Sequence, residues 1–338
     1  LPWNSPIGTL IWKLAPAIAA GNTVVIKPSE RASCSTLELM KILEEADLPE
    51  GLINVVTGFG PTTGAPLIEH QDVRMISFTG GTKGGSAASL SASKNVKPII
   101  MELGGKSPQI IFKDADLTLS VNGVVSGIFP VSGHSCISGS RILVHKDIKD
   151  KFTHNLLEVV KKAKVGHPND VATQIGPIAN KEQYEFILSK IEAAEKRGLK
   201  LLIDGRKEQK SEGYYIGPTI FDNVPNEDDL AQNEVFGPVA SIQTWEDEDE
   251  VIKIANDTIY GLAAGIWTND TNKAIRLADK IEAGTVYINN YFNASTQSPV
   301  GGFKQSGYGR ENGWEGMQSY MQTKSTWLAT NPSQPDPF

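Results

Sequence analysis

The chain has 338 residues, of which 40% are hydrophobic and 21% charged, so it is long enough for two domains that each bury a core. Its net charge of -7 argues against a nucleic-acid partner, because phosphate binding needs clustered positive charge. Its two cysteines cannot build a disulfide framework, and no apolar run approaches the roughly 20 residues of a bilayer span, which favours a cytoplasmic protein without a membrane anchor.

In the first part of the chain, short apolar runs alternate with segments of helical period. The runs cover residues 23–26, 53–56, 75–78 and 99–101. Between two of them, apolar residues recur at helical spacing from Leu39 to Ala46, and Pro49 and Gly51 end that helix. Strand–helix alternation of this kind predicts an α/β fold with a parallel sheet covered by helices.

The second part of the chain continues the α/β pattern. Three amphipathic helices are expected around residues 152–160, 184–191 and 274–281, and strands at 239–244 and 285–288. The acidic run 246–250 is interpreted as a solvated helix start. The proline-rich residues 332–338 are expected to form a loose tail.

Two glycine-rich segments are candidates for a phosphate site. FTGGTKGG, residues 78–85, places Gly80 and Gly81 between a strand and a helix that starts near Thr82, which would aim free amides at an anion. GFGPTTG, residues 58–64, also follows a strand, but no carboxylate follows at the expected distance. An unliganded turn explains either segment about as well.

Charged residues stand at two strand ends in this first part. Lys27 and Glu30 follow one strand, where open α/β sheets bind ligands, and they could hold the two hydroxyls of a ribose. A surface ion pair is the alternative. Glu102 ends another strand beside two glycines. Partial burial there would raise its pKa and prepare it to act as a general base.

The segment VSGHSCISGSR, residues 131–141, holds Cys136 among glycines and serines rather than in an apolar run. Such a setting suits a reactive thiol better than a packed one. Cys34, at the front of a helix, is interpreted as simple packing. EVFGPV, residues 234–239, could place Glu234 and Phe236 against a flat ring or fill a core. The five histidines have no metal-ligand spacing, so no metal is expected.

In their order and spacing, these motifs resemble the aldehyde dehydrogenase superfamily over residues 3 to about 326. The matching motifs are PWN, KPSE, FTGGT, ELGGKSP, a Gly-x-x-Cys segment, EVFGPV and PVGGFKQSGYGRE. The resemblance implies a Rossmann-like cofactor domain over residues 1–103 whose N-terminal part is missing. It also implies an α/β catalytic domain over 104–312 and a C-terminal helix and oligomerisation strand over 313–338.

The resemblance also implies roles for individual residues. Cys136 matches the nucleophile, Glu102 the general base and Asn4 the oxyanion-hole amide. The positions matching cofactor contacts are Trp3, Lys27, Glu30, Gly60, Gly64, Phe78, Gly80, Gly81, Thr82, Leu103, Glu234 and Phe236. The implied reaction is oxidation of an aldehyde to a carboxylic acid through a thiohemiacetal and a thioester on Cys136.

The residues themselves refine this implied function. Local amides and dipoles are expected to lower the pKa of Cys136 from about 8.5. The carboxylate of Glu102 favours hydrolysis over acyl transfer to coenzyme A, which stays an alternative, as does an inactive truncated homologue. The carboxylate of Glu30 favours NAD over NADP, because it repels a 2′-phosphate.

Some positions depart from the family pattern. His134 stands where glutamine is usual, and Gly81 where serine is usual. Because the family's leading segment is absent, we expect exposed sheet edges and apolar faces, so that the 338 residues alone fold poorly or bind cofactor weakly. Residues 325–329 resemble the family's inter-subunit strand, which implies a homodimer or homotetramer. Tyr291 and Phe292 could line the tunnel of an aldehyde whose identity the sequence leaves open.

Overall fold

The structure is a computed structural model that describes residues 1–210 and 212–338. Its helices are α1 (Pro6–Ala19), α2 (Cys34–Glu44), α3 (Ala65–Glu69), α4 (Thr82–Ser93), α5 (Leu117–Ser126), α6 (Lys149–Val160), α7 (Lys181–Lys196), α8 (Asp229–Gln232), α9 (Glu248–Asn256), α10 (Thr271–Ala278) and α11 (Gly313–Gln318). Its strands are β1 (Val24–Ile26), β2 (Ile53–Val55), β3 (Ile76–Thr79), β4 (Ile99–Glu102), β5 (Pro108–Ile111), β6 (Arg141–His145), β7 (Lys200–Ile203), β8 (Thr219–Asp222), β9 (Val239–Trp245), β10 (Tyr260–Gly261), β11 (Ala263–Trp267), β12 (Thr285–Ile288), β13 (Phe303–Lys304) and β14 (Gly307–Tyr308).

The first part of the chain builds two small sheets rather than one. Strands β1 and β2 pair in parallel, and β3 and β4 pair in parallel with β14 added antiparallel beside β4. The four apolar runs therefore form the predicted parallel strands. The chain returns to this region at Gly307, which lies opposite Glu102 in the β14–β4 ladder.

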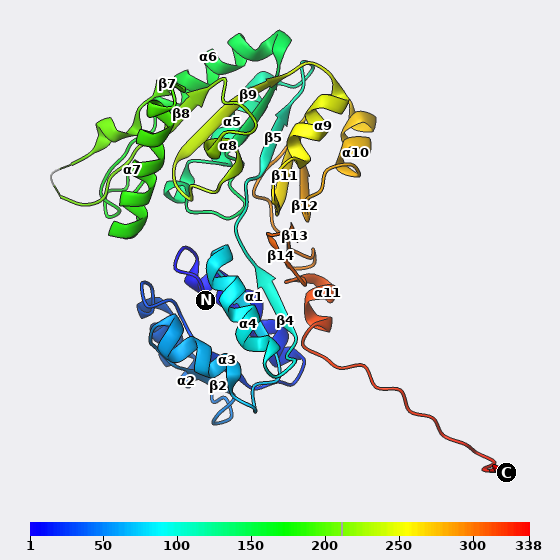
Figure 1. The fold of residues 1–338 in the computed structure, drawn as a ribbon. Coiled ribbons are helices and arrows are strands. Elements are labelled where there is room, and N and C mark those ends of the chain that lie inside the picture. Colours follow the sequence, from blue (N-terminus) through cyan, green and yellow to red (C-terminus); the bar gives the residue numbers. More distant parts are fainter. Residues whose placement is uncertain (211) are drawn as a thin grey trace.

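The second part is organised around a seven-stranded sheet with the order β12-β11-β5-β6-β9-β8-β7 (Figure 1). All neighbours run parallel except β7 and β8. Central strands of such a sheet are apolar on both faces because helices cover both, and β6 is buried along its whole length. The α/β class and the expected helices α6, α7 and α10 are confirmed.

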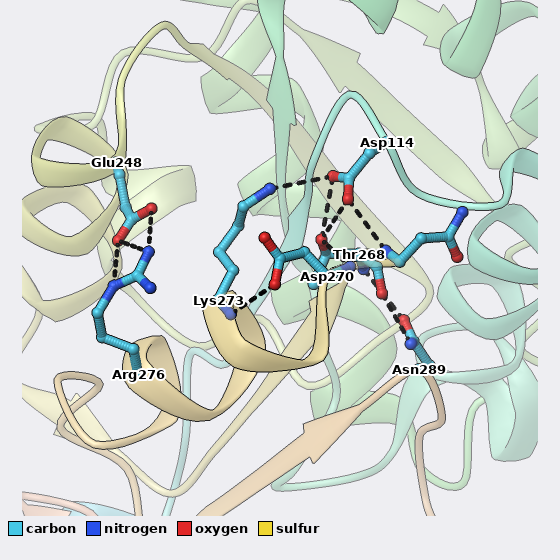
Figure 2. A network of polar contacts seen from close by, with 8 residues as sticks. Asp114, Glu248, Thr268, Asp270, Lys273, Arg276 and Asn289 are labelled. Atoms are coloured by element: carbon cyan, nitrogen blue, oxygen red, sulfur yellow. Dashed lines mark hydrogen bonds and ion pairs between the residues drawn. The ribbon is translucent and has the colours of Figure 1, made fainter.

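A polar network fastens α10 to the carboxyl ends of the central strands (Figure 2). The Thr268 hydroxyl donates to Asp114 at 2.8 Å, and the Lys273 ammonium lies 3.4 Å from the same carboxylate. Asn289 donates to the Thr268 carbonyl at 2.8 Å, and Arg276 donates three hydrogen bonds to Glu248 on α9. These contacts join α9 and α10 and the segments that follow β5, β11 and β12 of the large sheet.

Two expectations for exposed segments are corrected by the structure. Cys34, expected to be packed, is exposed at the start of α2. Residues 325–329 run in an extended tail that leaves the body after α11 and pair with no strand in the described chain (Figure 1). No helix of the described residues is both long and apolar enough to cross a bilayer.

Candidate active site

A single cavity of about 2420 Å³ gathers the candidate residues from both parts of the chain. Its lining includes Trp3, Asn4, Lys27, Glu30, Gly60, Gly64, Phe78, Gly80, Gly81, Glu102, Leu103, Cys136, Glu234 and Phe236. Thr82 is the one candidate outside the lining, and it lies beside the Tyr260 hydroxyl instead. The cavity is several times larger than an ordinary small-ligand pocket.

The loop that carries Cys136 is held from several sides. Val131, Ser132 and Gly133 all have positive φ, and a Cβ on Gly133 would stand 2.2 Å from the Gly237 carbonyl carbon. Only glycine fits there. On the other side of the sulfur, the Tyr291 hydroxyl donates to the Ile137 carbonyl at 2.8 Å. The thiol therefore sits on a backbone with little freedom.

The pKa of Cys136 differs from the expectation. Burial, together with the negative charges of Glu234 and Glu102, raises the pKa of this thiol to about 12. The expected lowering by local amides is wrong for this structure, because desolvation and two carboxylates outweigh the backbone hydrogen bonds. The neutral thiol is the resting form.

Glu102 ends β4 at the cavity wall and is buried, with 7% of its surface exposed. Its Oε1 atom has no hydrogen-bond partner among the described residues. Burial, and secondly the negative charge of Glu311, raises the pKa of Glu102 to about 9. The raised pKa agrees with the expectation for this carboxyl.

A buried ion pair whose charges act on Glu102 was not among the predicted site features. The Lys13 ammonium on α1 contacts the Glu311 carboxylate, and both also bond the Ser77 hydroxyl, at 2.9 and 3.1 Å. The available signal was the position of Lys13 within the buried stripe of α1, whose other members are Leu10, Leu14 and Ala17. A lysine in such a stripe needs a buried partner.

Replacing Lys13 by methionine is expected to lower the free energy of unfolding by about 3–5 kcal/mol, because Glu311 would be left buried and unpaired. Urea unfolding followed by circular dichroism measures the change. Lys41→Met is the matched control, since Lys41 pairs with Glu38 at the surface and its removal should cost less than about 1 kcal/mol. Equal losses in the two variants would contradict the importance of the buried pair.

The Asn4 side chain points at the Cys136 loop. Its Nδ2 donates one hydrogen to the His134 carbonyl at 2.9 Å, which leaves the second hydrogen of the amide for another acceptor. The His134 ring packs edge-on against Trp3 at 4.9 Å and is stacked with Phe236 at 5.9 Å. Burial lowers the pKa of His134 to about 4, so the imidazole is neutral at physiological pH and fills space between rings.

Glu234 and Phe236 approach the site from the turn before β9. Glu234 Oε1 accepts the Gly105 N–H at 3.0 Å, and a Cβ on Gly104 would stand 2.4 Å from its Oε2. The two glycines thus let this carboxylate come close. Burial raises the pKa of Glu234 to about 7. The Gln183 amide donates to the Phe236 carbonyl at 3.1 Å, which supports a residue of positive φ.

The cavity lining also includes the residues that the sequence predicts to contact a nucleotide. The Lys27 ammonium donates to the Gly58 carbonyl at 2.9 Å and lies 4.0 Å from Glu30. Gly81 is the N-cap residue of the 12-residue helix α4, and no side chain accepts a hydrogen bond from the first amides of that helix. These amides can therefore bind an anion. A Cβ on Gly80 would stand 2.9 Å from the Phe78 ring.

Tyr291 and Phe292, the two residues predicted to line a substrate tunnel, have different positions in the structure. Phe292 lines the cavity, together with Trp12 and Tyr287, whereas Tyr291 is not part of the lining. Tyr291 is 8% exposed and packs behind the loop that it anchors. Its contribution is to the backbone beside Cys136 rather than to the cavity surface.

Comparison with known proteins places the chain in one family. The model of the aldehyde dehydrogenase family matches residues 1–326. Aldehyde dehydrogenase 1A1 of Gallus gallus is 45% identical over 329 residues, which cover 97% of this chain and 64% of that protein. Betaine aldehyde dehydrogenase of Bacillus subtilis is 42% identical over 335 residues, which cover 98% of this chain and 68% of that protein. The chain thus spans about two thirds of the length of these relatives.

Solved structures agree with the sequence matches. Betaine aldehyde dehydrogenase of Staphylococcus aureus in complex with NAD+ superposes with a TM-score of 0.97 at 40% identity, over 100% of this chain and 67% of that one. A Burkholderia cenocepacia structure described as a putative aldehyde dehydrogenase also gives 0.97 at 40% identity, over 100% and 70%. The chain belongs to the aldehyde dehydrogenase family.

Proposed function

We propose that this chain carries the active site of an NAD-dependent oxidation of an aldehyde to a carboxylic acid. The observation that supports the proposal best is that the thiol of Cys136, the amide of Asn4 and the carboxyl of Glu102 line one cavity. We assign cofactor binding to residues 1–103 and the nucleophile to residues 104–312, with residues 313–338 serving oligomerisation. The family relationship and the NAD+ complex of a relative support this assignment.

The cofactor end of the cavity fits NAD. Lys27 and Glu30 would hold the adenosine ribose, and the uncapped start of α4 after Gly80 and Gly81 would hold the pyrophosphate. A carboxylate at Glu30 favours NAD over NADP. When bound, NAD supplies the acceptor for the hydride that leaves the tetrahedral adduct. Glu234 and Phe236 would position the nicotinamide end.

Attack on the aldehyde starts at Cys136. The thiol gives its proton to water, its sulfur bonds the carbonyl carbon, and the electron pair of the carbonyl double bond moves to the oxygen, which becomes negatively charged. Asn4 has one amide hydrogen engaged by the His134 carbonyl, and we assign the other to this oxygen, with the backbone N–H of Cys136 as second donor. The negative charges of Glu234 and Glu102 both disfavour the thiolate of Cys136. Because Glu102 is neutral below about pH 9, its charge is not present at neutral pH.

Glu102 acts in the second half of the reaction. Loss of hydride leaves a thioester on Cys136, and hydrolysis requires a water that has given up a proton. The ionised Glu102 carboxylate would accept that proton while the water oxygen bonds the acyl carbon and the carbon–sulfur bond breaks. Glu102 then returns this proton to the Cys136 thiolate, so the products are the carboxylic acid and the free thiol.

A product assay tests the proposed function. The chain is incubated with NAD and a panel of aliphatic and aromatic aldehydes, with and without coenzyme A, and NADH and the acyl product are quantified. Carboxylic acid in amounts equal to NADH supports the proposal. A coenzyme A thioester as main product would replace it by the acylating reaction, and no NADH with any aldehyde would indicate a non-catalytic homologue.

Replacing Asn4 by alanine is expected to lower kcat by about 10²–10³-fold, which is the usual effect of removing one oxyanion donor. The amide acts on charge that develops only in the transition state, so KM should change much less than kcat. Steady-state NADH formation over a range of aldehyde concentrations measures both constants. A rise in KM with kcat unchanged would contradict this role.

Two further assignments follow from the sequence and the fold. We propose a homodimer or homotetramer, because residues 325–329 extend from the body with the exposed side chains of Trp327 and Leu328. We also propose a reducing compartment such as the cytoplasm, because both cysteines are free and Cys34 is exposed.

A further inference from the structure

His134 lies where three separate segments of the chain meet. Its ring packs edge-on against Trp3 with 4.9 Å between the ring centroids, and it is stacked with Phe236 at 5.9 Å with the two planes 22° apart. Trp3 and Phe236 also contact each other edge-on, at 5.3 Å. All three separations lie in the range of favourable aromatic pairs. We call these three residues the ring triad.

The imidazole of His134 contributes its ring faces rather than its polar atoms. The residue is 5% exposed, and its Nε2 atom has no hydrogen-bond partner among the described residues. Burial lowers the pKa of His134 to about 4, so the ring packs without charge at physiological pH. A buried polar atom without a partner costs stability. What this position gains from a histidine is therefore the packing of a flat ring.

Phe236 depends on support from other segments. Its φ of 53° lies in the left-handed region, which bulky side chains rarely adopt and which persists only where the surroundings fix it. The Gln183 amide fixes the backbone by donating to the carbonyls of Val235 and Phe236, at 2.9 and 3.1 Å. The ring is fixed by Trp3 and His134. The direction of the Phe236 ring is thus set by its neighbours.

The ring triad borders the cavity with only two of its members. Trp3 and Phe236 line the cavity, whereas His134 is not part of the lining and packs on both rings from outside it. The backbone of His134 is engaged as well, since its carbonyl accepts the Asn4 amide at 2.9 Å. A change of the side chain leaves that carbonyl in place, so the ring can be tested separately from the Asn4 contact.

We propose that His134 is a positioning residue for hydride transfer: its ring holds Phe236 against the nicotinamide end of the cofactor. It thereby sets the distance between the substrate carbon that loses the hydride and the nicotinamide ring that accepts it. His134 itself touches no reacting atom. A displacement of about 1 Å in such a geometry can cost 10²-fold in rate. The inference rests on the proposed function, in which Phe236 positions the nicotinamide.

Two substitutions of His134 separate a flat ring from filled space. His134→Phe keeps a ring between Trp3 and Phe236 and should leave kcat and the KM for NAD within about threefold. His134→Leu fills a similar volume without a flat face and should lower kcat by about tenfold or more, with the KM for NAD within about threefold. With aldehyde deuterated at the carbonyl carbon, the isotope effect on kcat should rise in the leucine variant only, because hydride transfer then limits turnover.

A readout without turnover follows the nicotinamide directly. The reduced ring of NADH is fluorescent, and its anisotropy and lifetime report how firmly it is held. Both should fall in His134→Leu and be restored in His134→Phe. If the unsubstituted chain binds NADH but oxidises no aldehyde, the proposed function fails, and the fluorescence still decides whether His134 positions the nicotinamide.

A double substitution tests whether His134 acts through Phe236. If it does, adding His134→Leu to Phe236→Leu should cost no more than about a further twofold in kcat, because residues that act as one unit are not additive. Circular dichroism confirms that each variant is folded. The cycle needs only leucine substitutions, so it decides the question even if the larger ring of His134→Phe is not accommodated.

Several results would overturn the proposal. Equal kinetics of the phenylalanine and leucine variants would show that the flat ring at position 134 is not what matters. Losses that multiply in the double variant would show that His134 does not act through Phe236. Unchanged NADH fluorescence in His134→Leu, or an unsubstituted chain that binds no NADH, would show that the ring positions no nicotinamide.

Discussion

Replacing Cys136 by alanine is expected to abolish aldehyde-dependent NADH formation, with a loss of roughly 10³-fold or more in kcat, because Cys136 is the only cysteine that lines the cavity among the described residues. The cysteine supplies the bond that turns the aldehyde into a hydride donor. Alanine removes the sulfur while the loop keeps its anchors at Gly133 and Ile137. Cofactor affinity should therefore change little, and a fluorescence titration with NADH checks this.

Cys34→Ala is the matched control for this substitution. Cys34 is the only other cysteine of the sequence and is exposed on α2, so its loss should leave kcat within about twofold, as for most surface substitutions. Activity that survives in Cys136→Ala, or disappears in Cys34→Ala, would contradict the assignment of the nucleophile. If the unsubstituted chain forms no NADH, the reading of a non-catalytic homologue replaces the proposed function.

Much of the site was predictable because its residues follow strand ends. Apolar runs and helical periodicity identified β1 to β4, and the carboxyl end of each strand, with the residue that follows it, is where an α/β fold presents side chains to a ligand. Lys27, Gly80 and Glu102 were found in this way, and all three line the cavity. The local sequence pattern was therefore enough to predict these residues of the candidate site.

The remaining features depend on contacts between distant segments. The partner of Lys13 is Glu311, 298 positions away, and nothing in either local segment specifies the other. The thiol pKa was misjudged for the same reason, because it depends on the burial of Cys136 and on the charges of Glu102 and Glu234. Such terms are properties of the assembled site, so the sequence motif alone does not report them.

The predicted strand at 325–329 shows a second limit of sequence patterns. Its residues have the composition of a strand, but a strand exists only where a partner supplies the other half of the ladder. In the described chain these residues run away from the body (Figure 1). In the first part of the chain, β1 and β3 form as expected, in two sheets that no ladder of the described residues joins.

Replacing Glu102 by glutamine is expected to separate the two halves of the reaction. Acylation of Cys136 should continue and give a burst of NADH equal to the enzyme concentration. The steady-state rate should fall by about 10²–10⁴-fold, the usual contribution of a general base. Rapid mixing with excess aldehyde and NAD measures the burst, and mass spectrometry detects the acyl group on the protein. Loss of the burst together with the steady state would place Glu102 in acylation instead.

The pH dependence gives an independent check of the same residue. The pKa of Glu102 is raised to about 9, so the base form is scarce at neutral pH and grows about tenfold per pH unit until it levels off above pH 9. The rate of thioester hydrolysis in the unsubstituted chain should follow that rise, and in Glu102→Gln it should not. A flat profile in the unsubstituted chain would contradict a role for this carboxyl as base.

Stability should move in the opposite direction to rate. In the unfolded chain this carboxyl ionises near its ordinary pKa of about 4.3, whereas in the folded chain it stays neutral up to about pH 9. Its burial therefore lowers the free energy of unfolding progressively as pH rises between those two values. Glutamine carries no charge to desolvate, so Glu102→Gln should unfold at an equal or higher urea concentration at pH 8. A variant that turns over slowly and is no less stable has lost a catalytic group rather than a structural one.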